Sequence, residues 1–168
     1  MALDSANIIV PIIIVICAIF LIIGIIGLIA LWKLFKKAGE PGYAAIIPVY
    51  NIFKMSKIAT GKYTIAKLFT VSLCVYAIPV LFTISTMLLR FLIDSDSVMA
   101  VLLVLAMIIG QIGWLGLIGI LITFGFLAFK FTKSFGAKQA FCILAIFFAP
   151  VIFSIIGFNK ETKYVGTV

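Results

Sequence analysis

VMAVLLVLAMIIGQIGWLGLIGILITFGFLAF, residues 98–129, is an apolar run without a charged side chain. A transmembrane helix needs about 20 consecutive apolar residues, so this run is long enough to cross a bilayer. The whole chain is 65% apolar and only 11% charged, whereas soluble domains carry roughly 25% charged residues. This composition excludes an ordinary soluble domain, a disordered chain and a nucleic-acid-binding module, and it indicates an integral membrane protein.

Three further apolar runs are long enough to cross a membrane, at about residues 8–34, 65–89 and 139–158. Strands of a membrane β-barrel alternate between apolar and polar residues, whereas these runs are continuously apolar. The sequence therefore predicts an all-α integral membrane protein. Its four transmembrane helices would form a single domain over residues 1–168.

The run at residues 98–129 is longer than one simple crossing requires. Its 32 residues would extend about 48 Å as a helix, against a hydrocarbon core of about 30 Å. A tilted helix with an end that protrudes into the cytosol is the favoured interpretation. The alternative is a helix broken between Gly110 and Gly113, with the break lining a cavity.

The basic residues predict the orientation of the chain. They gather after the first and third apolar runs, whereas Arg90 between the second and third runs is balanced by acidic residues. Because inner loops are rich in lysine, both termini are expected outside and both basic segments inside, although Lys160 and Lys163 in the C-terminal tail oppose this. We expect contacts with anionic lipid headgroups or a partner protein at the inner face, from Lys33, Lys36, Lys37, Lys54, Lys57, Lys62, Lys130, Lys133 and Lys138.

The segment between the first two runs predicts a turn followed by a short helix. Gly39 suits the position just past a helix C-terminus, and Pro41 with Gly42 favours a turn. Residues 43–58 are too short to cross, and lysines alternate there with apolar and aromatic residues. An interfacial helix on the inner leaflet is favoured, and a re-entrant element is the alternative, which Pro48 disfavours because it leaves a carbonyl unpaired.

Small residues and prolines mark the spans themselves. Glycines recur every three residues at Gly110, Gly113, Gly116 and Gly119. Such a stripe favours close helix packing, and a pore wall or a groove for a lipid tail is the alternative. Gln111 and Trp114 beside the stripe could take part in this packing or line the pore. The Gln111 amide can hydrogen-bond across helices, and the Trp114 indole can fill space beside the glycines. Pro79 and Pro150 fall mid-span and are expected to kink their helices.

The side chains that usually carry out chemistry are scarce. The chain has no histidine, and its three cysteines lie inside apolar runs. The spans hold no Asp, Glu, His or Arg away from their ends, which disfavours ion-coupled transport. Neighbouring residues on a helix point in different directions, so Ser56 with Lys57 does not suggest a catalytic dyad. We predict no metal, no cofactor and no catalytic residue, and we favour a protein that is not an enzyme.

Two stretches resemble a known family. WKLFKKAGEPGYAAIIPVYN, residues 32–51, is similar to the pattern W-K-x-F-x-K-A-G-x-P-G-W-x-x-x-I-P-x-Y-N, with Tyr43 where tryptophan is commoner. TKSFGAKQAFCILAIFFAPVIFSIIGFNKETKYVG, residues 132–166, resembles the C-terminal companion of that pattern. Together they resemble a family of small bacterial membrane proteins that is catalogued as a domain of unknown function. A similar segment occurs in the membrane region of some type I signal peptidases.

The resemblance implies a multi-pass protein of the bacterial inner membrane and supplies no reaction. The chain has no peptidase domain, so protease activity is not carried over. We expect a non-enzymatic membrane module that associates with itself, with larger membrane machinery and with anionic lipid. The alternative is a small oligomeric channel, or a lipid or small-molecule carrier, lined by the glycine-rich third span.

Overall fold

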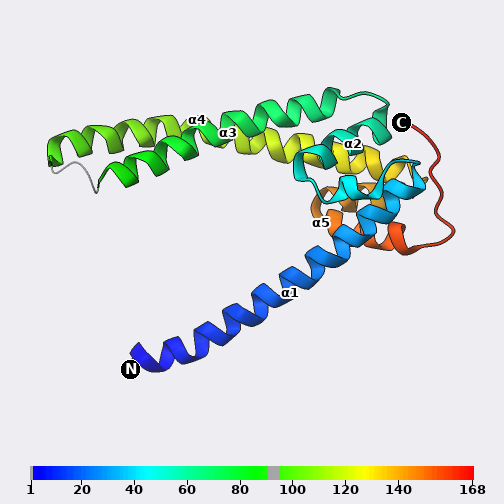
Figure 1. Cartoon of the computed structure of the whole chain (residues 1–168), viewed down its shortest axis with the longest axis horizontal. Helices are drawn as coiled ribbons and strands as arrows, with labels where there is room; N and C mark the ends of the chain where they lie inside the picture. Colours follow the sequence, from blue (N-terminus) through cyan, green and yellow to red (C-terminus); the bar gives the residue numbers. More distant parts are fainter. Residues whose placement is uncertain (1, 91–94) are drawn as a thin grey trace. The chain divides into compact units, whose positions relative to one another are not determined.

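The computed structural model describes residues 2–90 and 95–168, and the side chains among them from residue 9 onward. These residues form helices α1 (Ala2–Lys37), α2 (Pro48–Thr60), α3 (Thr64–Leu89), α4 (Asp96–Lys133) and α5 (Gln139–Phe158), and the 3-10 turn η1 (Gly42–Ala45) (Figure 1). Four helical stretches are long and apolar enough to cross a membrane: Ile9–Lys37, Thr64–Leu89, Asp96–Lys133 and Gln139–Phe158. The prediction of an all-α multi-pass membrane protein is therefore confirmed.

The chain divides into two compact units. Unit 1 comprises the chain up to Gly61 together with Ala128–Val168, and unit 2 comprises Lys62–Leu127. Helix α4 therefore contributes its last turns to unit 1 and the rest of its length to unit 2. The single domain expected from the sequence stays a prediction.

Local sequence explains where α1 ends and α2 begins. Gly39 has a φ of 77°, and the Glu40 amide donates a hydrogen bond of 2.9 Å to the Phe35 carbonyl. This six-residue loop is a Schellman cap, and it confirms Gly39 as the residue just past the helix. Pro48 occupies the first turn of α2, where its missing N–H costs nothing. The short helix expected at residues 43–58 is therefore divided into η1 and α2.

Helix α4 is continuous from Asp96 to Lys133. A break between Gly110 and Gly113 is therefore absent, and the unbroken form of the third span is the correct interpretation. Unit 2 consists of this helix up to Leu127 together with α3, which is also assigned as one helix through Pro79.

Helix α5 is bent. Phe148 has φ −123° and ψ 42°, which are not helical values, and Pro150 follows two residues later. The kink predicted at Pro150 is therefore confirmed, because proline removes an N–H and crowds the preceding turn. The buried face of α5, which includes Cys142, Ala145 and Ile152, belongs to the core of unit 1, where α5 packs against α1.

An aromatic cluster fills the core of unit 1. Phe131 is fully buried, and its ring makes edge-to-face contacts with Phe35 at 6.1 Å, Phe135 at 5.2 Å and Phe153 at 5.3 Å between centroids. Such pairs add roughly 0.5–1.5 kcal/mol each beyond the burial of their area. The cluster therefore joins the ends of α1 and α4 to the second half of α5.

Candidate functional site

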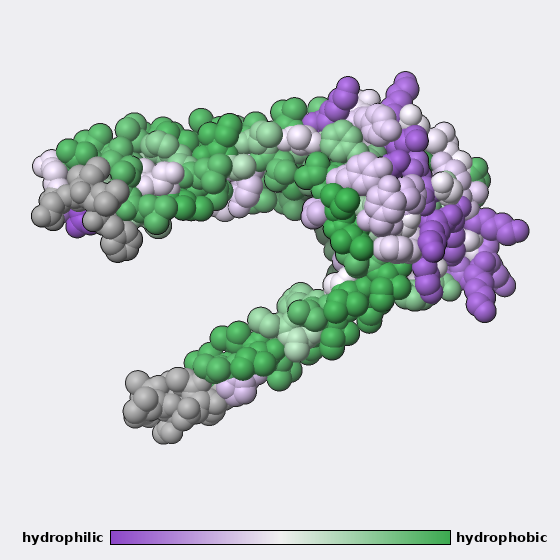
Figure 2. Space-filling view, viewed as in Figure 1, coloured by the Kyte–Doolittle hydropathy of each residue, from purple (hydrophilic) through white to green (hydrophobic). Residues whose placement is uncertain are grey.

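The basic end of unit 1 is the candidate site. We define it as the last turns of α1, helix α2, the last turn of α4, the connection at residues 134–138 and the tail at residues 159–168. Figure 2 shows hydrophilic residues gathered over this end, whereas apolar residues cover α1 away from it. Of the nine lysines predicted for lipid or partner contact, eight belong to unit 1, and Lys62 belongs to unit 2.

Glu40 holds two of the predicted lysines. Its carboxylate accepts a hydrogen bond from the Lys54 ammonium at 2.5 Å and another from Lys57 at 2.9 Å. The Glu40 and Lys54 side chains are only 15% and 14% exposed, whereas Lys57 is 46% exposed. Glu40 therefore ties the turn after α1 to helix α2, and Lys54 serves this contact rather than an open surface.

The same contact shifts the ionisation of both partners. Hydrogen bonding to the Lys54 ammonium lowers the pKa of the Glu40 carboxyl below its ordinary value of 4.5, although burial opposes the shift. The Glu40 carboxylate in turn raises the pKa of Lys54 above its ordinary 10.5. Both groups are therefore charged at neutral pH, and each favours the charged form of the other.

Lysines at the end of α1 contact α5 or their own helix. The Lys37 ammonium donates to the carbonyls of Ile156 at 3.0 Å and Asn159 at 2.6 Å. These carbonyls lie at the end of α5, where a helix leaves its acceptors unpaired and favours a cation. Lys33 lies 4.1 Å from the centre of the Phe158 ring, and Lys36 lies 5.9 Å from that of Trp32.

Four lysines of the basic end are exposed. Their side chains form no hydrogen bond or ion pair within the part of the chain that the structure describes. They are Lys133, Lys138, Lys160 and Lys163. Lys130 instead donates to the Val168 carbonyl at 2.9 Å. The structure thus separates the predicted lysines into those that hold the fold together and those whose ammonium groups are open to an anion.

The tail is fastened to the basic end by backbone carbonyls. The Val165 amide donates to the Ser134 carbonyl at 2.8 Å, and the Tyr164 hydroxyl donates to the Ile58 carbonyl at 2.8 Å. Burial raises the pKa of Tyr164 above its ordinary 10.0, so this donor stays protonated. Tyr164 also stacks edge-on against Phe135 at 5.7 Å, which attaches the tail to the aromatic core.

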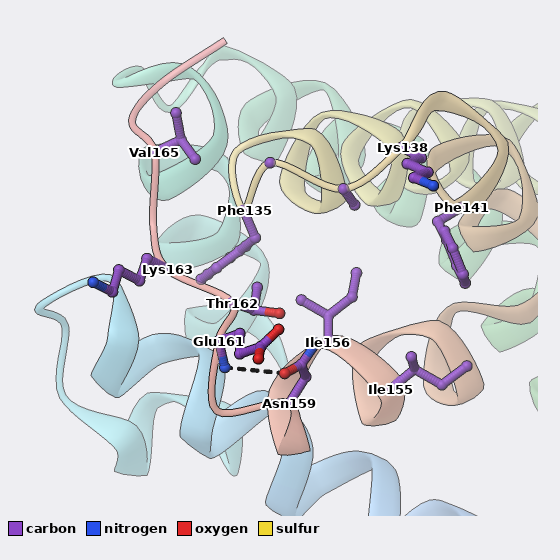
Figure 3. A pocket seen from close by; sticks show the side chains of 12 residues that line it. Phe135, Lys138, Phe141, Ile155, Ile156, Asn159, Glu161, Thr162, Lys163 and Val165 are labelled. Atoms are coloured by element: carbon purple, nitrogen blue, oxygen red, sulfur yellow. Dashed lines mark hydrogen bonds between the residues drawn. The ribbon is translucent and has the colours of Figure 1, made fainter.

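A pocket of about 490 Å³ lies between the two ends of α5 and the tail. Figure 3 shows Phe135 and Ile156 on its walls, with Lys138 to one side and Lys163 to the other. Asn159 orders the tail here, because its side-chain oxygen accepts the Glu161 amide at 3.0 Å. The pocket combines apolar walls with charged groups at its edges.

The predicted turn residues have defined structural roles. Pro41 precedes η1 with φ −65° and ψ 127°, which starts the turn. Gly42 is buried against Trp32, and a Cβ at this position would collide with the indole ring. The turn therefore requires glycine for its close approach to α1.

Three of the four stripe glycines in unit 2 face α3. A Cβ at Gly116 would lie 2.5 Å from the Tyr76 nitrogen, one at Gly119 would lie 2.6 Å from the Ser72 hydroxyl oxygen, and one at Gly113 would lie 3.4 Å from the Pro79 Cβ. Such spacing lets two backbones approach closely, as helix packing requires.

Gly110, the fourth glycine of the stripe, does not contact α3 in this way. Nothing lies within 4 Å of a Cβ built at Gly110, which lines a hollow of about 290 Å³ together with Trp114 and Pro79. Trp114 is 62% exposed, and Gln111 is also exposed. The structure therefore brings together Gly113, Gly116 and Gly119 as a packing face and leaves Gln111 on the surface of α4.

The basic end can bind phosphate or carboxylate groups through lysine ammonium groups.

Among the described residues, no group of three or more His, Cys, Asp or Glu side chains could hold a metal ion. Ser56 is buried within α2, and its carbonyl accepts the Thr60 hydroxyl at 2.8 Å.

Sequence reasoning missed Glu40 and Tyr164. Glu40 is the only acidic residue between Asp4 and Asp94, and this isolation among lysines was a signal that an ion pair forms there. Tyr164 carried no such signal, because the Ile58 carbonyl to which it donates lies more than a hundred residues earlier in the chain.

Comparison with known proteins gives one result that identifies the chain. No curated protein and no solved structure matches it. The model of a family of unknown function, DUF5684, matches residues 43–167. This range includes residues 132–166 and the last part of the first stretch that carries the resemblance, whereas the resemblance to signal peptidases stays a prediction. The chain therefore belongs to the family of unknown function DUF5684.

Proposed function

We propose that the protein is a non-enzymatic multi-pass membrane module that acts by association. Its partners would be anionic lipid headgroups together with a second copy or larger membrane machinery. The observation that carries this proposal is the set of exposed lysines at the basic end, whose side chains form no hydrogen bond or ion pair within the described part of the chain: Lys133, Lys138, Lys160 and Lys163. Lysines near an anionic membrane surface contribute about 1 kcal/mol each to binding.

The proposed setting is the bacterial cytoplasmic membrane, with the N-terminus outside and the basic end inside. Lysine-rich connections favour the cytoplasmic side, and the family resemblance implies a bacterial inner membrane. Helix α2 would lie in the interface, because its 13 residues extend only about 20 Å and cannot cross. Tyr43 in η1 and Tyr50 in α2 are exposed, as suits the headgroup region.

Lipid retention tests the proposal. The doubly substituted variant Lys133→Gln/Lys138→Gln is compared with Lys133→Arg/Lys138→Arg, which keeps both charges. Native mass spectrometry would measure the phosphatidylglycerol retained by each protein after purification from vesicles of phosphatidylglycerol and phosphatidylcholine. We expect the glutamine variant to lose binding roughly tenfold or more, because two favourable contacts of about 1 kcal/mol are removed. Equal retention by the two variants would contradict the role in lipid binding.

The alternative function, a channel or carrier lined by the third span, is the less favoured proposal. A pore wall needs its glycines to face open space, whereas Gly113, Gly116 and Gly119 face α3 within unit 2. Solute flux through liposomes that is lost in Gln111→Leu and kept in the wild type would support this alternative over association.

A further inference from the structure

The second half of α5, after its bend, packs closely against α1. Pro150, just after the bend, lies against Gly27, where a Cβ would be 3.2 Å from the proline Cβ. Seven residues later, a Cβ at Gly157 would lie 2.7 Å from the Ala30 carbonyl oxygen. Both helices therefore advance together along this contact, which means that the second half of α5 runs parallel to α1.

The contacts at the end of α5 show that the two helices stay side by side up to the end of α1. Phe158 meets Lys33, and the Asn159 carbonyl accepts a hydrogen bond from Lys37 in the last turn of α1. Because α1 ends at the basic end, the second half of α5 returns to the basic end as well.

The first half of α5 begins at the same end. Gln139 follows α4 after a connection of five residues, and the Phe153 ring lies 5.3 Å from that of Phe131 in the last turn of α4. In a straight helix Phe153 would lie about 21 Å beyond Gln139. The Ser134 carbonyl, which accepts the Val165 amide at 2.8 Å, joins the residues before and after α5 directly.

The bend explains how an apolar helix can return. Phe148 and Pro150 divide α5 into halves of about 10 residues, and each half is about 15 Å long, which is half of the hydrocarbon core. Backbone groups freed inside a membrane must be paired or packed against protein. Pro150 itself is packed against Gly27 of α1, and the Lys37 ammonium donates to the carbonyls of Ile156 and Asn159 at the end of the second half.

We propose that α5 is a re-entrant helical hairpin that enters and leaves the bilayer from one face. The tail at residues 159–168 then lies on the same side as the basic connections, and the chain crosses the membrane three times. This arrangement replaces the outer C-terminus that was predicted from four crossings and the positions of the basic residues. It also assigns Lys160 and Lys163 to the inner surface that meets anionic headgroups, and this last assignment rests on the proposed function.

The distribution of charge supports the hairpin independently. The chain has 13 basic residues, and with an inner tail all of them except Arg90 lie on the inner side. Arg90 forms an ion pair of 3.0 Å with Asp96. A fourth crossing would instead leave Lys160 and Lys163 outside, against the preference of lysine for the inner face. The pocket between the ends of α5 would then open toward the headgroups of the inner leaflet.

Cysteine labelling from one face of the membrane tests the hairpin in the full chain. The background carries alanine in place of Cys17, Cys74 and Cys142. Single cysteines are introduced as Thr167→Cys in the tail, Lys138→Cys before α5 and Ser97→Cys in the first turn of α4. Sealed vesicles of one orientation are treated with a membrane-impermeant maleimide. We expect Thr167→Cys and Lys138→Cys to be labelled from one face and Ser97→Cys from the other.

Labelling of Thr167→Cys together with Ser97→Cys would overturn the hairpin, because α5 would then cross the membrane. Lys163→Cys is a second tail position with the same expected outcome, which covers a failure of Thr167→Cys to fold. Sidedness does not depend on lipid affinity, so loss of the lipid effect with a confirmed inner tail would reject the proposed function alone.

Discussion

Glu40 is the residue on which the geometry of the basic end most directly depends. It is largely buried and receives two lysine ammonium groups, so its removal leaves Lys54 in a mostly enclosed position without its anion. We expect Glu40→Gln to lower the free energy of unfolding by roughly 1–3 kcal/mol, the cost of leaving a buried hydrogen-bonding group without its partner. Unfolding in detergent measures this, and Glu161→Gln, in the exposed tail, is the matched control. Equal stability of the two variants would contradict the structural role of Glu40.

The same carboxylate predicts a dependence on pH. The pKa of Glu40 is lower in the folded chain than its ordinary 4.5, chiefly because Lys54 donates to it. A depressed pKa stabilises the fold above the unfolded value, and this contribution is lost as the pH falls through the folded value. The stability difference between the wild type and Glu40→Gln should therefore be constant at neutral pH and shrink progressively below about pH 4.5. A difference that grows on acidification would contradict the shift.

Gly116 shows how one missing side chain sets the separation of two helices. A Cβ there would lie 2.5 Å from the Tyr76 nitrogen and 2.9 Å from the Ser72 carbonyl oxygen, so the backbone of α3 must move. We expect Gly116→Ala to destabilise unit 2 by about 1–3 kcal/mol, as overpacking does. Gly110→Ala is the control, because nothing lies within 4 Å of its Cβ. Titration with denaturing detergent would compare the two, and equal midpoints would reject the close approach.

At the scale of the element, sequence reasoning located the helices well because span length and apolarity are local properties. The first run was expected to end at Leu34, and the helix extends to Lys37, since Gly39 rather than the last apolar residue decides its end. The short helix was correctly expected between the first two runs, but Pro48 starts α2 instead of interrupting it. The proposed hairpin form of α5 could not be predicted in this way. Hydropathy gives the length of an apolar run, but it does not show whether the two ends of that run lie close together.

Lys37 tests the contact between α1 and α5. It donates to two carbonyls at the end of α5, which are otherwise left without intrahelical donors. We expect Lys37→Met to reduce the free energy of unfolding by about 1–2 kcal/mol. Lys36→Met should have a smaller effect, because the Lys36 ammonium lies over the Trp32 ring of its own helix. Hydrogen exchange of the amides after Ile156 gives a second readout, and protection that is the same in both variants would contradict the cap.

At the scale of the whole molecule, the candidate site could be predicted only in part. The lysine positions follow directly from sequence, but their division into internal and exposed groups depends on contacts between distant segments. Lys54 meets Glu40 through a turn, and Lys37 meets Asn159 across 122 positions. The division into two units could not be predicted either, because α4 passes from one unit to the other as one continuous helix.

The orientation of the whole chain should respond to charge at its N-terminal end. No lysine or arginine precedes Lys33, and the balance of basic residues across the first span sets which end stays outside. Ala2→Lys, Ser5→Lys and Asn7→Lys together should therefore produce a population inserted in the opposite sense, whereas glutamine at the same three positions should not. Impermeant labelling of Lys138→Cys and Thr167→Cys measures the inverted fraction. If α5 is a hairpin, both sites must invert by the same fraction, since they share one face in either orientation. An unchanged orientation would show that the N-terminal charge is not decisive, and unequal fractions at the two sites would require that α5 crosses the membrane in part of the population.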